Sequence, residues 1–414
     1  MLKGDILMKI NGNIIIGQSG GPTAAINATL AGVFYEGTQR CDGKIYGMLG
    51  GVEGLLRENI VDLREHLKGE EELELLKRTP SSYLGSCRFK LPEPCEGNEI
   101  YEKLFEIFEK YDIKGFFYIG GNDSMDTVKK LSEYNKFKNT DIRFMGVPKT
   151  IDNDLVVTDH TPGFGSAAKF VATVTKELVR DSLVYDMKSV TVVEIMGRDA
   201  GWLTGASALA KSDDCEGAAM VLLPEVPFDY EYVKNRVREL TEGDKSLVIT
   251  VSEGVRTKDG KYVCELGSEK GTDAFGHTML TGTAQTIATM LKNDLGIKTR
   301  AVELSTLQRS ASHIASLTDI EESFAVGGAA VKAASEGESG KMALLKRVSD
   351  NPYVCETATH DVREIANFAK EVPRSMINEN GDNVTDEFIT YVRPLIEGEL
   401  VPVFENGLPK HIKR

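Results

Sequence analysis

Two short apolar runs near the middle of the chain constrain its fold more than any other feature. The run at residues 116–119 ends in two glycines, and the run at residues 144–147 ends in a proline. Polar residues follow both runs: Asn122, Asp123 and Ser124 after the first, and Lys149, Thr150, Asp152, Asn153 and Asp154 after the second. Buried strands that end in this way are typical of open α/β sheets, in which ligands bind at the carboxyl ends of adjacent strands. The acidic residues and Lys149 therefore predict a site for phosphate and metal at the carboxyl ends of these two strands.

The whole chain has the size and composition of a soluble multidomain protein. Its 414 residues, 41% apolar and 27% charged, allow two or three domains. The net charge of −14 disfavours binding to nucleic acid or to anionic lipid, so we expect neither partner. The six cysteines form no CxxC pair, which is typical of reduced cytosolic thiols. The start lacks a signal-peptide pattern and no apolar run approaches the roughly 20 residues of a membrane span, so we expect a cytoplasmic protein.

Strand and helix patterns alternate along most of the chain. This alternation predicts an α/β fold with mostly parallel sheets, arranged as two doubly wound domains that face each other across a cleft. The segment beyond residue 341 is mixed and polar and carries no recognisable motif. We expect strands at 13–16, 116–119, 144–147, 190–195, 218–223, 247–251 and 300–304, and helices from about Thr23 and at 70–77, 99–111, 163–179, 230–240, 278–291 and 321–334.

Two loops before the central runs are candidate anion sites. The first strand leads through the glycine turn GQSGGPT into a helix, and backbone N–H groups at a helix start favour anions. A tight turn without a ligand would carry the same residues. The second loop, TPSSYLGSCRFK, places Arg88 and Lys90 among serines and glycines in an acidic protein. Its cations suit phosphate, although a solvated surface loop is the alternative reading.

The acids after the second apolar run could perform acid–base chemistry. Asp152 and Asp154 lie two residues apart on a segment expected to be extended, so period-two alternation would place both on one side. Together with Asp123 they could bind Mg²⁺ through oxygen and leave one carboxylate as a general base. Lys149 could neutralise phosphoryl charge. The alternative is an Asx turn that only caps the strand.

Later strand ends carry further groups suited to phosphate and sugar. Arg198, Arg300 and Arg309 lie at or near strand edges, and arginine is suited to bidentate phosphate recognition. Glu253 follows a buried strand and could accept hydrogen bonds from sugar hydroxyls. The residues together indicate phosphoryl transfer to or from a small phosphorylated polyol.

Seven motifs in order make the chain resemble the phosphofructokinase family over about residues 14–335. They are GQSGGPTAAIN, GSCRF, IGGNDS, PKTIDND, EIMGRDAGWL, VSEG and LQR. The resemblance implies two α/β domains with the active site in their cleft, and transfer of a phosphoryl group to the 1-hydroxyl of fructose 6-phosphate to give fructose 1,6-bisphosphate. It implies a phosphoryl-donor and Mg²⁺ domain at 1–163 with about 308–335, a sugar-phosphate domain at 164–307, and an extension at 336–414 packed on the core.

The resemblance also implies a role for each matching residue. Asp152 would take the proton from the sugar hydroxyl, and Gly20 and Arg88 would contact the phosphoryl donor. Arg300 matches an arginine that reaches into a neighbouring subunit's site, so a homodimer or homotetramer is implied. Contacts to the sugar phosphate are implied for Thr150, Asp152, Met196, Gly197, Arg198, Glu253 and Arg309, and for Thr306, which stands where many ATP-using members have histidine. The metal ligands would be Asn122, where the family usually has aspartate, and Asp154.

Two positions indicate the phosphoryl donor. Members that use ATP typically have glycine where this chain has Asp123 and Lys149, so the pairing looks like the pyrophosphate-dependent branch. An aspartate would fill and repel the place of the α-phosphate of ATP, whereas the lysine would hold the charge of pyrophosphate. Pyrophosphate is a weaker driver than ATP, so the reaction would run in both directions.

Two alternatives stay open from the sequence. The same fold could use ATP, or phosphorylate another sugar phosphate such as sedoheptulose 7-phosphate. A non-catalytic regulatory subunit is favoured by Asn122 and disfavoured by the presence of Asp152, Asp154, Lys149 and Arg309.

Overall fold

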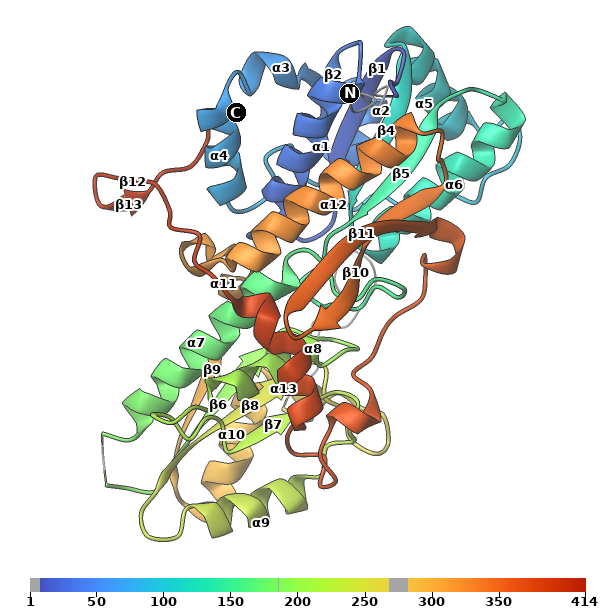
Figure 1. Cartoon of the computed structure of the whole chain (residues 1–414). Coiled ribbons are helices and arrows are strands. Elements are labelled where there is room, and N and C mark those ends of the chain that lie inside the picture. Colours follow the sequence, from blue (N-terminus) through green and yellow to red (C-terminus); the bar gives the residue numbers. More distant parts are fainter. Residues whose placement is uncertain (1–7, 185, 268–281) are drawn as a thin grey trace.

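The computed structural model describes residues 8–184, 186–267 and 282–414, and its strands form two main sheets, one in each half of the molecule (Figure 1). The larger sheet has seven strands in the order β11-β10-β5-β4-β1-β2-β3. Its strands are β1 (Asn13–Gln18), β2 (Ile45–Met48), β3 (Ile60–Asp62), β4 (Ile113–Gly120), β5 (Arg143–Pro148), β10 (Lys341–Asp350) and β11 (Tyr353–Asp361). The five inner strands run parallel, whereas β3 and β11 are antiparallel edges. The predicted α/β class is confirmed.

Side-chain alternation along β4 explains why helices cover both faces of this sheet. Phe117 and Ile119 pack with α1 (Ile26–Arg40) and α12 (Leu317–Ser335), while Phe116 and Tyr118 pack with α5 (Glu99–Lys110) and α6 (Asn122–Lys138). Helices α1 and α12 approach closely because glycine forms their contact: a Cβ on Gly32 would lie 2.0 Å from the carbonyl oxygen of Phe324. The remaining helices of this half are α2 (Gly51–Leu56), α3 (Leu63–His66) and α4 (Glu70–Arg78).

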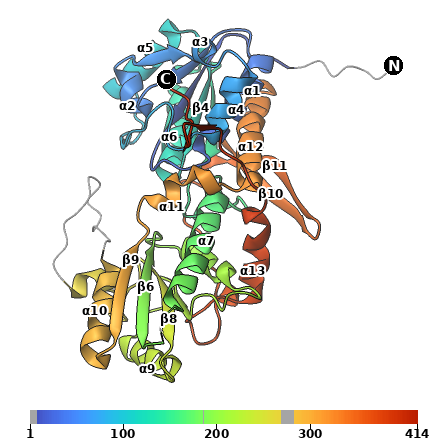
Figure 2. The same ribbon diagram turned by 90° about the vertical axis from the view of Figure 1, so that its left-hand side faces the viewer.

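The second half is built around a four-stranded, wholly parallel sheet in the order β7-β8-β6-β9. Val193 and Ile195 of β6 face one set of helices, and Val190 and Val192 face the other. Figure 2 shows this half from the side, with helices on both sides of the sheet. The strands are β6 (Ser189–Ile195), β7 (Met220–Leu222), β8 (Ser246–Ser252) and β9 (Lys298–Glu303). The helices are α7 (Phe164–Ser182), α8 (Trp202–Gly205) and α13 (Asp386–Val392) on the first side, and α9 (Tyr230–Leu240) and α10 (Thr283–Leu295) on the second.

The segment beyond residue 341 forms structure that the sequence pattern did not predict. β10 pairs parallel with β5 and carries β11, so the extension adds two strands to the larger sheet. The chain then passes to the other half as α13 and returns toward α4, where Ile412 N–H donates to Thr79 Oγ1 at 3.0 Å (Figure 1). Because only residues 342–345 of β10 are buried and β11 is mostly half-exposed, neither strand gives a strong apolar signal.

Two helix starts differ from the predicted ones by more than one residue because side chains bond to the backbone there. The predicted start of the helix at 278–291 lies outside the described residues. Helix α1 begins at Ile26 instead of Thr23, since Thr23 Oγ1 accepts from Ile26 N–H at 2.9 Å and stays outside the helix. Helix α12 begins at Leu317, four residues before the predicted start, after its capping residue Ser316. One short α-helix, several 3₁₀ turns and a small ribbon complete the described structure. The helix is α11 (Leu307–Ser310), and the ribbon is formed by β12 (Phe404–Glu405) and β13 (Leu408–Pro409). The 3₁₀ turns are Ala206–Ala210, Val263–Leu266, Ser312–Ile314, Val362–Glu364, Arg374–Met376 and Arg393–Ile396.

Among the residues that the structure describes, no helix combines the length and apolar character of a membrane span.

Candidate active site

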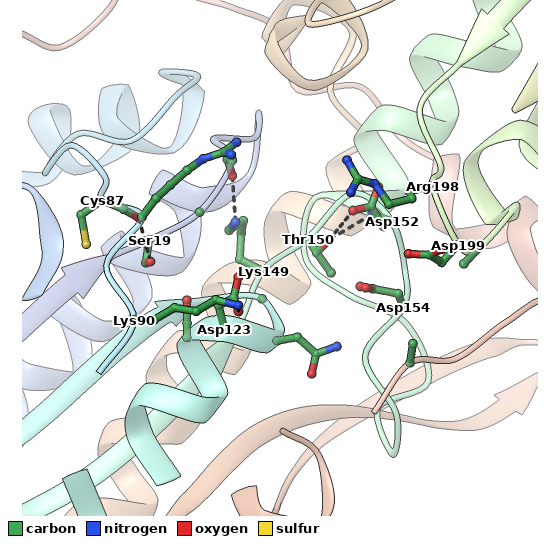
Figure 3. Close-up of a pocket in the computed structure, with 18 of the residues that line it drawn as sticks. Ser19, Cys87, Lys90, Asp123, Lys149, Thr150, Asp152, Asp154, Arg198 and Asp199 are labelled. Atoms are coloured by element: carbon green, nitrogen blue, oxygen red, sulfur yellow. Dashed lines mark hydrogen bonds and ion pairs between the residues drawn. The ribbon is translucent and has the colours of Figure 1, made fainter. Parts of the chain in front are cut away.

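A cavity of about 590 Å³ lies between the two halves, at the carboxyl ends of β1, β4 and β5. Figure 3 shows its two ends: Lys90, Asp123 and Lys149 gather at one, and Asp152, Asp154, Arg198 and Asp199 at the other. The first half lines it with Ser19, Gly20, Gly21, Cys87, Arg88, Phe89, Lys90, Gly121, Asn122, Asp123, Ser124, Lys149, Thr150, Asp152 and Asp154, and the second with Arg198, Asp199, Ala200 and Tyr262. The polar groups predicted after the two central strands, apart from Asn153, therefore share one cavity with Arg88, Lys90 and Arg198.

Lys149 places a buried cation at the first end of the cavity. It follows β5, its exposed fraction is 3%, and its ammonium donates to the carbonyl oxygen of Gly21 at 2.7 Å. Burial lowers the pKa of Lys149 to about 8, against the opposing charges of Asp152 and Asp154. Gly20 turns with φ +77°, and a Cβ there would lie 3.2 Å from the lysine ammonium. The glycine turn and this ammonium are thus fitted to each other.

Further cations surround the same turn. A Cβ on Gly21 would meet the Arg309 guanidinium at 2.9 Å, so this arginine of α11 reaches over the turn from the other side. Burial and the nearby charge of Arg88 lower the pKa of Arg309. Three cations, Lys149, Arg88 and Arg309, therefore converge on the turn, and this arrangement suits a multiply charged anion.

Asp123 lies in the first turn of α6, at the same end of the cavity as Lys149. Its carboxylate is 3.1 Å from the Lys90 ammonium, and both side chains are more than half exposed, at 61% and 57%. An exposed pair of this kind adjusts readily to a ligand. The two cations of the predicted serine–glycine loop, Arg88 and Lys90, thus both line the cavity.

Asp152 and Asp154 face the same cavity, but not for the predicted reason. The segment after β5 is a turn, in which Asn153 has φ +54°, so the expected period-two alternation of an extended strand is wrong. Asn153 is fully buried: its Oδ1 accepts from Thr161 N–H at 3.1 Å and its Nδ2 donates to the Tyr391 hydroxyl at 2.9 Å. This fixed turn presents the two carboxylates to the cavity.

Burial perturbs the acids of the second end. It raises the pKa of Asp152 against the charges of Lys149 and Arg309, and the Thr150 hydroxyl donates to its Oδ2 at 3.3 Å. Burial, followed by the charge of Asp152, raises the pKa of Asp154 to about 7. Burial likewise raises the pKa of Glu253 to about 8, with Asp152 as the next cause. Carboxyl groups with such pKa values can exchange protons near neutral pH.

The wall from the second half is shaped by the turn after β6. Gly197 has φ +147°, and the Ser252 hydroxyl donates to its carbonyl oxygen. Met196 N–H donates to Gln308 Oε1 at 3.2 Å, which ties this turn to α11 and hence to Arg309. Arg198 itself lines the cavity.

Some predicted residues lie outside the cavity of this chain. Arg300, on the edge strand β9, is 55% exposed, lies 3.5 Å from Asp181 and lines a separate surface pocket. Its predicted role in a neighbouring subunit stays a prediction. Thr306 immediately precedes α11, where its carbonyl oxygen accepts from Arg309 N–H at 3.3 Å. Met196, Gly197, Glu253 and Arg309 are likewise not among the residues that line the cavity.

Asn122, the predicted metal ligand, contacts the C-terminal extension. Its Nδ2 donates to the carbonyl oxygen of Phe368 at 2.7 Å, and its Oδ1 accepts from Asn367 N–H at 3.0 Å. The amide oxygen thus already accepts one hydrogen bond. A divalent cation still fits the other donors, since Asp154 and Asp152 are buried together and the charge of Asp152 raises the pKa of Asp154.

Several residues of the site escaped the sequence interpretation. Asp199 and Tyr262 line the cavity, and Ala369 brings the extension to its rim. Asp199 could have been found from its place directly after Arg198 in EIMGRDAGWL. Ala369 lies in a segment without a motif, and only the three-dimensional structure places it there.

Comparisons with known proteins agree with this geometry. The family profile described as phosphofructokinase matches residues 13–334. The pyrophosphate–fructose 6-phosphate 1-phosphotransferase of Halomonas elongata is 42% identical, covering 97% of this chain and 96% of its own, and that of Methylococcus capsulatus is 40% identical, covering 97% and 95%. The crystal structure of a pyrophosphate-dependent phosphofructokinase from Nitrosospira multiformis is 37% identical and superposes with a TM-score of 0.87, covering 97% and 96%. The predicted resemblance is confirmed, and the chain belongs to the phosphofructokinase family.

Proposed function

We propose that this chain catalyses the reversible transfer of a phosphoryl group from pyrophosphate to the 1-hydroxyl of fructose 6-phosphate, giving fructose 1,6-bisphosphate and phosphate. The observation that carries the proposal is the buried Lys149 ammonium against the Gly20–Gly21 turn, with Asp123 at the same end of the cavity. A compact, highly charged donor such as pyrophosphate matches this end of the cavity better than a nucleotide does. The α-phosphate of ATP would extend toward Asp123, whose negative charge would repel it. The relatives at 40% and 42% identity bear the name of the same activity.

In the proposed reaction Asp152 is the general base. Its carboxylate takes the proton of the 1-hydroxyl, the hydroxyl oxygen forms a bond to the near phosphorus of pyrophosphate, and the bond from that phosphorus to the bridging oxygen breaks. The proton held on Asp152 leaves to solvent or to the departing phosphate. The raised pKa of Asp152 supports this role, because burial makes its carboxylate a stronger base than that of an exposed aspartate.

Charge stabilisation is assigned to the cations around the glycine turn. Lys149, Arg88 and Arg309 would hold the pyrophosphate oxygens in line with the hydroxyl and offset the charge that develops on them. On the sugar side, Arg198 lines the cavity and Glu253 lies close enough for its carboxyl pKa to respond to the charge of Asp152. We propose the contacts of Thr150, Met196, Gly197 and Thr306 with the sugar phosphate on the same basis.

A divalent metal accompanies the chemistry of this family, and we propose Mg²⁺. Asp154, with Asp152 beside it, would hold the ion, and the remaining lone pair of the Asn122 amide oxygen could add a ligand. When bound, Mg²⁺ neutralises phosphoryl charge and orients the donor.

We also propose a cytoplasmic location and a homodimer or homotetramer in which Arg300 contributes to the active site of the neighbouring subunit.

The test is a comparison of phosphoryl donors with fructose 6-phosphate and Mg²⁺, in which fructose 1,6-bisphosphate formation is followed by a coupled assay. We expect turnover with pyrophosphate, and formation of pyrophosphate from fructose 1,6-bisphosphate and phosphate. Turnover with ATP alone would contradict the donor assignment. The absence of turnover with either donor, in a protein that still binds fructose 6-phosphate, would instead support a regulatory subunit.

A further inference from the structure

The segment at residues 367–372, named here the bridging segment, passes from one half of the molecule to the other beside the active-site cavity. It leaves the larger sheet after β11 and leads toward α13 in the second half. At its start, Asn367 N–H and the Phe368 carbonyl oxygen bond to both ends of the Asn122 amide, in the first turn of α6. Ala369 then lines the cavity. The segment therefore touches the helix that carries Asp123 before it crosses.

Lys370 bonds to the loop that carries the acid pair. Its backbone N–H donates to the carbonyl oxygen of Asp154 at 2.7 Å. Its ammonium donates to the carbonyl oxygens of Asp159 at 2.6 Å and Thr158 at 3.3 Å. Main chain and side chain thus hold the loop at two points four to five residues apart. Burial lowers the pKa of Lys370 to about 8, as expected for an ammonium enclosed between the loop and its neighbours.

The same residue also contacts the wall of the second half. The Trp202 indole N–H donates to the Lys370 carbonyl oxygen at 2.9 Å, and the ammonium lies 5.2 Å from the centroid of that indole ring. Two residues on, Val372 N–H donates to Glu225 Oε1 at 2.9 Å, and this oxygen also accepts from Gly201 N–H at 2.8 Å. Glu225 therefore joins the bridging segment to the turn that presents Arg198 and Asp199 to the cavity.

We infer that Lys370 is a positioning residue for the phosphoryl transfer, an inference that rests on the proposed function. It holds the Asp152–Asp154 turn at a fixed place relative to the sugar-side wall, and Glu225 completes the connection. Asn153 anchors that turn on one side, through Thr161 and Tyr391, and Lys370 anchors the following residues on the other. Catalysis is sensitive to displacements of a base of about 1 Å, so a looser loop lowers the rate of the chemical step more than it weakens binding.

The inference predicts a specific split between kcat and KM. In Lys370→Met the aliphatic stem remains and the ammonium bonds to Thr158 and Asp159 are lost. We expect kcat to fall about 10- to 100-fold, while the KM values for pyrophosphate and fructose 6-phosphate stay within about threefold of wild type. Glu225→Leu removes the oxygen that accepts from both Val372 N–H and Gly201 N–H. This variant should likewise lower kcat and leave the two KM values nearly unchanged. Glu225→Gln retains a carbonyl oxygen for Gly201 and Val372 and should keep kcat within about threefold.

The matched control is Lys169→Met. Lys169 is also a mostly buried lysine whose ammonium donates to a backbone carbonyl oxygen, that of Gly398, but it lies on α7 and does not line the cavity. We expect this variant to lower the melting temperature and to leave kcat per folded molecule unchanged. The single tryptophan, Trp202, gives a second readout: its fluorescence should change in Lys370→Met and remain as in wild type in Lys169→Met.

The outcomes separate the two proposals. Wild-type protein without pyrophosphate-dependent turnover would overturn the proposed function itself. Given wild-type turnover, unchanged kcat in both Lys370→Met and Glu225→Leu would overturn the positioning role. A raised KM for fructose 6-phosphate with kcat retained would also overturn it, because Lys370 would then act in binding. If Lys370→Met does not fold, the pair Glu225→Leu and Glu225→Gln decides the question.

Discussion

The ammonium of Lys149 donates a 2.7 Å hydrogen bond to the carbonyl oxygen of Gly21, so that a buried positive charge lies against the glycine turn that follows β1. This contact joins two strand ends that are 128 residues apart in the sequence. One bond to a backbone oxygen leaves the ammonium two further donors. In the proposed function, these two N–H donors of Lys149 bind oxygen atoms of pyrophosphate.

Removal of the Lys149 charge should therefore impair the use of pyrophosphate. We expect Lys149→Met to lower kcat/KM for pyrophosphate by at least about 100-fold, since preorganised charge is a large term in phosphoryl transfer. Lys90→Met is the control, because Lys90 is exposed and lies against Asp123; its loss should cost about tenfold or less, mainly in KM. The measurement is steady-state kinetics with pyrophosphate varied at saturating fructose 6-phosphate.

The double variant Asp123→Gly with Lys149→Gly should lose pyrophosphate turnover as well. Undiminished turnover in this variant would refute the assignment of Asp123 and Lys149 to the phosphoryl donor.

Asp152 should be required for chemistry and not for binding of the sugar phosphate. We expect Asp152→Asn, which keeps the size of the side chain and removes its basicity, to lower kcat by at least about 1,000-fold. Binding of fructose 6-phosphate, measured by calorimetry, should change by less than about fivefold. Asp199→Asn offers a matched comparison, because Asp199 lines the same end of the cavity but has no assigned proton transfer. A loss of less than about tenfold in Asp152→Asn would remove this residue as the base.

The sequence predicted the strand ends well and the connections between them poorly. The residues after β1, β4, β5 and β6 could be identified because buried apolar runs and glycines mark where a parallel strand stops. Asp152 and Asp154 were correctly placed together, yet through a turn at Asn153 whose left-handed backbone no alternation pattern reveals. Asn122 was the predicted metal ligand, and in the structure its amide bonds to the extension, while its metal role stays a prediction.

The bridging segment marks the limit of what the sequence could predict. Apart from the Lys370 ammonium, Lys370 and Val372 contact the site through backbone N–H and carbonyl groups, which nearly all residues possess and which leave no signature in the sequence. The strands β10 and β11 were missed for a related reason, since an edge that is half-exposed needs few apolar residues. Long-range contacts of this kind depend on the folded topology.

The perturbed pKa values predict a bell-shaped pH profile for kcat/KM. Activity should rise with pH as the acid pair ionises, because burial raises the pKa of Asp152 and raises that of Asp154 to about 7. It should fall again as Lys149, with a pKa of about 8, loses its proton. The maximum is therefore expected between about pH 7 and 8. The arginine in Lys149→Arg stays charged throughout this pH range, so the activity that this variant retains should not fall at alkaline pH. If kcat/KM still fell as in wild type, another group would be the cause of the decline.

Buried His160 should make part of the folding stability depend on pH. Its Nδ1 lies 2.8 Å from Asp159 Oδ2 and its Nε2 lies 2.6 Å from Glu322 Oε2. Burial lowers the pKa of His160, but the two carboxylates together outweigh this effect and raise it above the ordinary value of 6.5. A histidine whose pKa is raised on folding stabilises the folded state fully below its unfolded pKa, and this contribution is lost as the pH rises through the folded value.

We therefore expect His160→Gln to destabilise the protein most at acidic pH. Removal of one partner from a buried charge network typically costs about 3–5 kcal/mol. The loss should be largest near pH 6 and should shrink as the pH rises through the folded pKa of His160, above which the wild-type ring is neutral as well. Thermal or urea unfolding of wild type and variant across this pH range measures the difference in their free energy of unfolding, in which titrations common to both proteins cancel.

His360→Gln is the control, because His360 pairs with exposed Glu364 at 2.6 Å. Its loss should change the free energy of unfolding by less than about 1 kcal/mol at any pH. A difference for His160→Gln that stays constant or grows with pH would show that the ring is neutral in the folded protein.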